Sequence, residues 1–151
     1  MDEAVSMVTT VRAVKRISGR QKAALIDCGV HILPTAFSYD HEIRPVEDRG
    51  QAVEDYRIVG PLCMQIDVVR ENVNLPALRA GDRLVIRDAG AYNFSQSMQF
   101  IFMRPNHVMV HAGGVDVIRE MEQDGHVRSL ERLPPHLIND ETRNSLTARG
   151  R

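Results

Sequence analysis

Lysine is the residue this sequence most conspicuously lacks. Its 151 residues contain only Lys15 and Lys22, against 17 arginines. Chemistry that needs a lysine amine from this chain is therefore confined to two positions. An excess of positive charge is also missing, because 19 basic residues face 20 acidic ones and the net charge is -1. This balance gives no electrostatic reason to expect nucleic acid or an anionic membrane as a partner.

Long apolar runs and a secretion signal are absent as well. No apolar run approaches the ~20 residues that a membrane span needs. Met1 is followed by Asp2 and Glu3, whereas a signal peptide begins with a basic and then an apolar segment. We therefore expect a cytoplasmic protein without a membrane partner. In that compartment the two cysteines, Cys28 and Cys63, are expected to be free thiols, although a disulfide is open in principle.

What the sequence does contain is a series of short β-type segments. A length of 151 residues suits one domain with a sizeable core. Residues 8–15 alternate and are rich in β-branched side chains, and the Ser18-Gly19 turn joins them to residues 22–27 in a predicted hairpin. Further extended segments are predicted at residues 38–46, 53–59, 83–87, 99–103 and 107–111. This regular spacing of strands and turns predicts a mainly β fold, an antiparallel barrel or sandwich.

The pattern changes after Gly113-Gly114. Residues 115–123 carry Val117, Ile118 and Met121 at helical spacing, with Asp116 as candidate N-cap. Residues 127–135 predict a further short helical turn. We therefore expect one domain over residues 1–138 that closes with short helices, followed by a polar tail over residues 139–151.

Two segments carry candidate functional residues. In GPLCMQID, a Gly-Pro turn is followed by Cys63 and, four residues later, by Asp67. A protonated thiol can act as a proton donor, but a buried packing role for Cys63 and a turn or cap role for Asp67 are open alternatives. In DAGAYNFSQS, small residues precede Tyr92, whose hydroxyl can donate to a phosphate or carboxylate oxygen. The alternative for Tyr92 is a core tyrosine whose hydroxyl lies at the surface.

The histidines do not predict a metal site. His107 and His111 would share one face of a strand but lie roughly 13 Å apart, too far to bind one zinc ion. No carboxylate or thiol completes a recognisable spacing, so we expect no metal. Phosphate-binding, dinucleotide-binding, nucleophile-elbow and CxxC motifs are also missing from the sequence.

Taken in order, several segments resemble one enzyme family. GPLCMQID, LRAGDRLVIRDAGAY and FSQSMQFIFMRPNHVMV resemble the C-terminal half of the pyridoxal-phosphate-dependent diaminopimelate, ornithine and arginine decarboxylases with the alanine-racemase-like fold. LIDCGVHILPTAF and HEIRPV resemble earlier segments of the same region, and VIREMEQDGHVRSLERLP resembles its siderophore-type branch. The resemblance covers roughly residues 5 to 135.

The resemblance implies a two-part enzyme of which this chain is the second part. The first part would be an N-terminal β/α barrel that holds most of the pyridoxal phosphate and supplies the lysine that bonds to it; neither Lys15 nor Lys22 resembles that lysine. A piece of a longer protein is the simplest account of the chain, and a naturally split gene is the alternative. By resemblance, the full enzyme decarboxylates an amino acid as a head-to-tail homodimer, and this chain alone is expected to be inactive.

The resemblance also assigns roles to single residues. Cys63 would reach the partner subunit's site and donate a proton to the carbon that has lost carbon dioxide, or would orient the substrate. Tyr92 would bind the cofactor or its phosphate. Asp67 is a candidate for substrate binding, with loop shaping as the role the family pattern favours. Met64 stands where diaminopimelate and ornithine decarboxylases have an acidic residue, so a different substrate is expected. Cys28 is interpreted as a packing residue.

Two other functions are compatible with these residues. One is an amino-acid racemase of the same fold, which shares the two-part architecture but which the cysteine segment disfavours. The other is a non-catalytic regulatory or interaction domain derived from such an enzyme. A barrel with a cofactor lysine encoded upstream would favour an enzyme, and its absence would favour the interaction domain.

Overall fold

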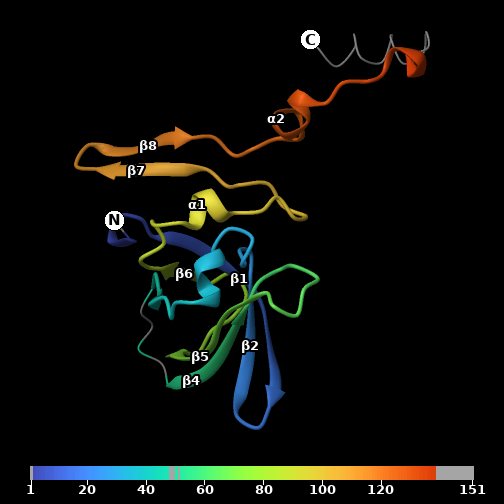
Figure 1. Cartoon of the computed structure of the whole chain (residues 1–151). Helices are drawn as coiled ribbons and strands as arrows, with labels where there is room; N and C mark the ends of the chain where they lie inside the picture. The colour runs from blue at the N-terminus through green and yellow to red at the C-terminus, as the bar shows by residue number, and fades with distance from the viewer. Residues whose placement is uncertain (1, 48–49, 51, 139–151) are drawn as a thin grey trace. The chain divides into compact units, whose positions relative to one another are not determined.

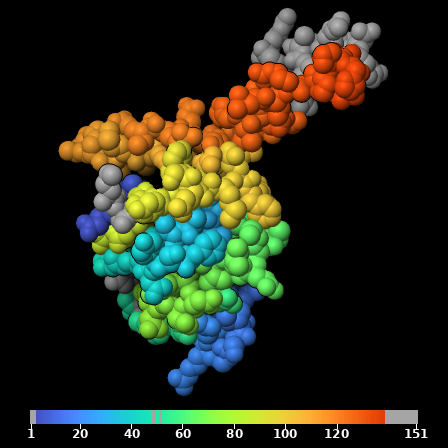
Figure 2. All heavy atoms as spheres, viewed as in Figure 1, coloured from blue at the N-terminus to red at the C-terminus, as the bar shows by residue number. Residues whose placement is uncertain are grey.

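The first two strands form the hairpin that the alternating sequence predicts. In this computed structural model, which describes residues 2–47, 50 and 52–138, β1 (Met7–Ser18) pairs antiparallel with β2 (Gln21–Ile26). Gly19 takes a φ of 52° in the turn between them, a conformation that costs glycine little. Figure 2 shows the blue tip of this hairpin projecting from the rest of its unit.

Four more strands complete the main sheet (Figure 1). They are β3 (Ile43–Pro45), β4 (Val53–Val59), β5 (Val68–Pro76) and β6 (Arg83–Ile86), and the sheet order is β3-β6-β1-β2-β4-β5. All neighbours pair antiparallel except β2 and β4, which run parallel. Both β3 and the 3-10 helix η2 (Pro34–Phe37) contact β5, so the sheet curls into a nearly closed barrel. The predicted mainly β, barrel-like fold is confirmed.

The core fills the inside of this curved sheet. Alternate residues of a strand face opposite sides, and the inward positions are buried and mostly apolar. All six strands contribute to this core: Val11, Ala24, Ile26, Ile43, Tyr56, Ile58, Val69, Leu75, Leu84 and Ile86. Loop residues Cys28 and Leu33 pack onto the same cluster, which places the loop after β2 firmly against the barrel.

Tyr56 adds a buried polar bond to this core. Its hydroxyl donates to Glu54 Oε2 at 2.5 Å and accepts the Leu78 backbone N–H at 2.8 Å. Burial, and then the hydrogen bond to Glu54, raise the pKa of Tyr56 to about 12, so the hydroxyl stays protonated and able to donate. Lys22 contacts the same Glu54 carboxylate at 2.6 Å, which joins β2 to β4.

We expect Tyr56→Phe to lower the free energy of unfolding by about 1–3 kcal/mol, because it leaves the Leu78 amide without its acceptor. Chemical denaturation measures the change. Tyr39→Phe is the matched control, since Tyr39 is 59% exposed and its hydroxyl makes no hydrogen bond within the described residues. Equal stability of the two variants would contradict the role of the Tyr56 hydroxyl.

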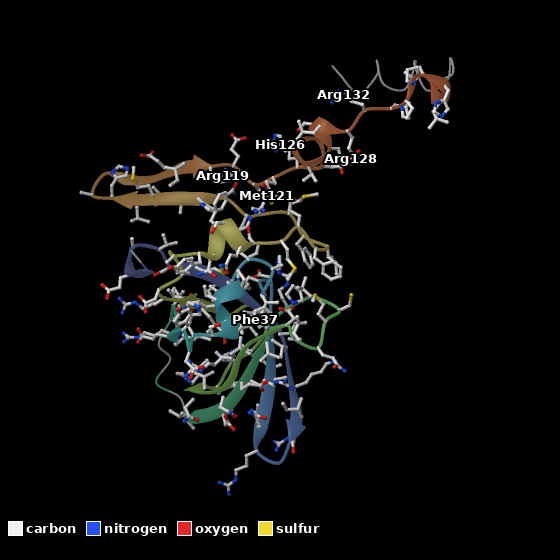
Figure 3. The ribbon with its side chains drawn as sticks, in the orientation of Figure 1. Phe37, Arg119, Met121, His126, Arg128 and Arg132 are labelled. Carbon is white, nitrogen blue, oxygen red and sulfur yellow. The ribbon has the colours of Figure 1, made fainter. Side chains whose placement is uncertain are left out.

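The residues after Arg104 form a second unit, Pro105–Arg151, and the first is Met1–Arg104. The second unit contains a hairpin of β7 (His107–His111) and β8 (Gly114–Arg119), followed by α2 (Asp124–Val127), η3 (Arg128–Leu130) and η4 (Pro135–Leu137). Arg128, labelled in Figure 3, pairs with Asp124 and Glu131 around the α2–η3 turn. The predicted domain over residues 1–138 and its tail stay a prediction, since residues 139–151 lie outside the described part of the chain.

Two predicted elements differ from the structure, and one strand was not predicted. Residues 115–123 were expected to be helical, but β8 occupies most of them, because its β-branched residues pair with β7 across the turn at Ala112 and Gly113. Residues 99–103 form a bend instead of a strand, with Ile101 at a φ of 69°. The strand β5 was not expected, since polar residues interrupt its apolar positions.

Two short elements, η1 (Asp2–Ala4) and α1 (Asn93–Gln96), complete the fold. No helix among the described residues is long and apolar enough to cross a membrane.

Candidate functional site

The loop between β4 and β5 presents Cys63 to solvent. The Gly60 N–H donates to the Asp67 carbonyl at 3.0 Å, which closes the base of the loop, and the Asp67 N–H donates to the Met64 carbonyl at 3.1 Å. Cys63 lies on the outer part of this closed loop and its side chain is exposed. Within the described residues its thiol makes no hydrogen bond, so it is available to a ligand or a partner.

The Asp67 carboxylate holds that loop in place from inside. Asp67 is only 3% exposed, and its Oδ2 accepts the Leu62 N–H at 2.7 Å, one residue before Cys63. Its Oδ1 accepts the Val30 N–H at 2.8 Å, which ties the Cys63 loop to the loop after β2. A buried carboxylate that accepts two backbone amides is a strong crosslink.

Two glycines make room for this carboxylate. A Cβ added at Gly29 would lie 2.2 Å from Asp67 Oδ1, and one added at Gly60 would lie 2.3 Å from Oδ2. Such approaches are far inside van der Waals contact, so both positions require glycine. Both Asp67 oxygens thus bind backbone, and the geometry favours loop shaping for Asp67. Its candidate role in substrate binding stays a prediction.

The second cysteine is in a different environment. Cys28 is 8% exposed and belongs to the hydrophobic core. Burial raises the pKa of its thiol to about 12, although a hydrogen bond with Thr9 acts in the opposite direction. The interpretation of Cys28 as a packing residue is confirmed. Both cysteines are free thiols.

Tyr92 follows β6 in a backbone conformation that few tyrosines adopt. Its φ is 65°, in the left-handed region, and its side chain is 62% exposed. For a bulky residue such a conformation costs of order 1–3 kcal/mol and often marks a functional site. Tyr92 lines an open cavity of about 210 Å³ together with Thr35, Tyr39, Asp40, His41, Asp88 and Ala91. A phenol at the mouth of a cavity is available to hydrogen-bond a ligand.

Buried polar residues that the sequence did not single out lie behind Tyr92. Asn93 is 3% exposed; its Oδ1 accepts the Thr35 N–H at 3.1 Å and the Thr35 hydroxyl at 2.6 Å. Thr35 Oγ1 also lies 2.8 Å from His41 Nε2. Thr35 and Asn93 are 58 positions apart in the chain, so no local sequence signal joins them.

His31 anchors the segment after α1. The Met98 N–H donates to the His31 carbonyl at 2.9 Å, and the His31 ring lies 5.6 Å from the Phe102 ring. Burial lowers the pKa of His31, while the Asp67 carboxylate acts in the opposite direction. The segment after α1 therefore contacts the loop after β2 through Met98 and Phe102, and residues 99–103 form no strand. Among the described residues, no group of three or more His, Cys, Asp or Glu side chains could hold a metal ion.

A family model described as the pyridoxal-dependent decarboxylase, C-terminal sheet domain, matches residues 1–90. The chain belongs to the pyridoxal-dependent decarboxylase family. The matched region of the decarboxylase sheet domain includes β1 to β6 and the Cys63 loop. The resemblance to this family is thus confirmed, whereas the closer affinity to its siderophore-type branch stays a prediction.

Individual relatives agree with this membership. Diaminopimelate decarboxylase of Archaeoglobus fulgidus is 34% identical over 137 residues, which cover 87% of this chain and 32% of the relative. The same enzyme of Methanothermobacter thermautotrophicus is 31% identical over 143 residues, covering 90% and 32%. The chain therefore spans about a third of the length of these decarboxylases.

A solved structure extends the agreement to the fold. The crystal structure of diaminopimelate decarboxylase from M. jannaschi is similar with a TM-score of 0.78 and 29% sequence identity. The similarity covers 88% of this chain and 31% of that one. A further crystal structure of the same enzyme contains L-lysine and has the same similarity.

Proposed function

We propose that this chain completes the active site of a pyridoxal-phosphate-dependent amino-acid decarboxylase. It would act with an N-terminal β/α barrel and within a homodimer in the cytoplasm. The observation that carries the proposal is the closed, carboxylate-braced loop that exposes the unpaired Cys63 thiol. A loop braced in this way can deliver a side chain to a fixed point at little entropic cost.

The residues around Tyr92 fit one end of the cofactor. An exposed phenol on a rigid turn can donate a hydrogen bond to a phosphate oxygen, and we assign that role to Tyr92. Lys22 pairs with Glu54, and Lys15 lies exposed on β1, so the lysine that bonds to the cofactor would come from the barrel. When bound, the cofactor supplies an electron sink for the charge left on the substrate carbon.

Cys63 would then supply the proton. As carbon dioxide leaves, the electron pair of the broken carbon–carbon bond stays with the substrate. Cys63 Sγ would hold a proton and pass it to that carbon, forming a carbon–hydrogen bond and leaving a thiolate. The thiolate would regain its proton from water, which the exposure of Cys63 permits.

Met64 bears on the choice of substrate. A thioether cannot pair with the ammonium group at the far end of diaminopimelate or ornithine. The loss of a charge-assisted bond of ~1.5–3 kcal/mol would weaken such substrates about tenfold or more. We therefore propose that the substrate is an amino acid without a distal ammonium. Because the chain is similar to proteins named diaminopimelate decarboxylase, diaminopimelate is also among the substrates to be tested.

The direct test joins this chain to its barrel and measures two products in one sample. With a panel of amino acids that includes diaminopimelate, ornithine and neutral side chains, we expect carbon dioxide release and no inversion of the substrate. The chain without a barrel should release none, because it supplies no cofactor lysine. Stereoinversion without carbon dioxide release would favour a racemase. If neither carbon dioxide release nor stereoinversion were observed and the protein bound another decarboxylase tightly, the result would favour a non-catalytic interaction domain.

A further inference from the structure

The buried residues behind Tyr92 form a chain of hydrogen bonds whose protons can be assigned one by one. It runs from the Ala89 carbonyl through Asn93, Thr35 and His41 to the Arg87 carbonyl. Both ends are backbone carbonyls, which only accept. The number of protons that the intervening side chains need is therefore determined.

The Asn93 amide fixes the first direction. Its Nδ2 donates to the Ala89 carbonyl at 3.1 Å, and its Oδ1 accepts the Thr35 backbone N–H at 3.1 Å. Rotating the amide by 180° would set a donor against the Thr35 N–H and an acceptor against the Ala89 carbonyl. Asn93 Oδ1 therefore also faces the Thr35 hydroxyl, at 2.6 Å, and the hydroxyl must donate to it.

The direction passes through Thr35 to His41. A hydroxyl has one proton, and since Thr35 gives it to Asn93, Thr35 Oγ1 can only accept from His41 Nε2 at 2.8 Å. His41 Nδ1 lies 3.1 Å from the Arg87 carbonyl, so this ring nitrogen must donate as well. A histidine that donates from both nitrogens is an imidazolium cation.

The surroundings of His41 can hold that charge. His41 is 6% exposed, and the Asp40 and Asp88 side chains line the same cavity. Arg70 donates to the His41 carbonyl and pairs with Asp40 at 3.2 Å; Arg87 pairs with Glu42 at 3.3 Å. Both ring nitrogens thus bond to acceptors, and the cavity beside the ring is lined by Asp40 and Asp88, whose charge is opposite to that of an imidazolium.

We propose that His41 is a doubly protonated positioning residue that, through Thr35 and Asn93, holds Tyr92 in its left-handed conformation. Asn93 is the residue after Tyr92, and its side chain bonds to Ala89 on the other side, so the two ends of the bend are joined. The ring charge directs the Thr35 hydroxyl to Asn93 and keeps that junction closed. The expected effect of His41 on cofactor binding rests on the proposed role of Tyr92. The assignment of two ring protons to His41 does not depend on that role.

The first test is nuclear magnetic resonance of the intact protein with 15N-labelled histidine. We expect His41 to have two ring N–H groups, assigned in the wild-type protein from their proximity to Thr35. This measurement needs no variant and no cofactor. A His41 ring with one protonated nitrogen in the folded protein would overturn the inference, whatever the fate of the proposed function.

The second test measures the dissociation constant for pyridoxal phosphate in the intact protein, which is this chain joined to its barrel. We expect His41→Phe and Thr35→Val each to raise it about tenfold, and Thr35→Ser, which keeps the hydroxyl, to change it less than about threefold. In a Tyr92→Phe background, His41→Phe and Thr35→Val should each add less than about twofold, because their effect acts through the phenol. Full, additive losses in that background would overturn the positioning role. An unchanged constant in Tyr92→Phe alone would instead contradict the role assigned to Tyr92.

Discussion

Asp67→Asn is expected to lower the free energy of unfolding by about 2–5 kcal/mol, close to the loss expected for Asp67→Ala. Both carboxylate oxygens accept backbone N–H groups, from Val30 and Leu62, and nine-tenths or more of the residue is buried. An asparagine supplies one acceptor, and its NH₂ group would face one of the two N–H groups. A change that is nearly isosteric should therefore remove half of the crosslink and add a donor–donor contact.

Chemical denaturation measures this loss, and Asp116→Asn is the control. The Asp116 side chain is 66% exposed and pairs with His111 at 3.0 Å, an arrangement worth about 0–1 kcal/mol. Turnover of the protein with its barrel is the second readout, because a loosened loop no longer holds Cys63. If Asp67→Asn had wild-type stability, the Asp67 carboxylate would not be needed to hold the loop. If the variant were destabilised but kept wild-type turnover, holding the loop would not be needed for catalysis.

Glycine substitutions probe the same contact from the opposite side. Gly60→Ala leaves the carboxylate in place but sets a methyl group 2.3 Å from Asp67 Oδ2, so the loop must shift. Gly125→Ala is matched to it, because nothing lies within 4 Å of a Cβ at that position. If both variants had the same stability, the close approach of Gly60 to the Asp67 carboxylate would not be needed for the stability of the fold.

The sequence predicted the features of the barrel that depend on neighbours in the chain. Alternation and the Ser18-Gly19 turn suffice for β1 and β2, because a hairpin is local. The same reasoning failed for residues 115–123, where helical spacing and β-branched alternation occur together and pairing with β7 decides between them. It also missed β5, in which the polar residues Arg70 and Asn74 pair with Ile58 and Asp55 of β4.

The residues of the candidate site also differ in whether the sequence could reveal them. Cys63, Asp67 and Tyr92 stand in short motifs, so the resemblance to a family is enough to point to them. The partners that hold them could not be found from the sequence: Val30 lies 37 positions from Asp67, and Thr35 lies 58 from Asn93. Positive φ at Tyr92 likewise has no sequence signal, because Asn93 and its partners stabilise a conformation that the tyrosine alone disfavours.

Cys63→Ala is expected to lower kcat of the protein with its barrel by about 10²–10⁴-fold, the usual contribution of a positioned general acid. Pyridoxal phosphate should still bind with its wild-type affinity, because the cofactor contact that we propose is Tyr92 and not the thiol. Cys28→Ala is the matched control: it removes the other thiol from the core, where it lowers stability but should leave kcat unchanged while the protein is folded.

The origin of the product proton distinguishes donation from mere substrate orientation. A thiol fixed on one side of the substrate carbon delivers hydrogen to one face, so decarboxylation in D₂O should give a product with deuterium in a single configuration. In Cys63→Ala, water replaces the thiol and can approach from more than one direction, so we expect both configurations. A slow variant that still forms one configuration would mean that Cys63 orients the substrate and that another group donates the proton.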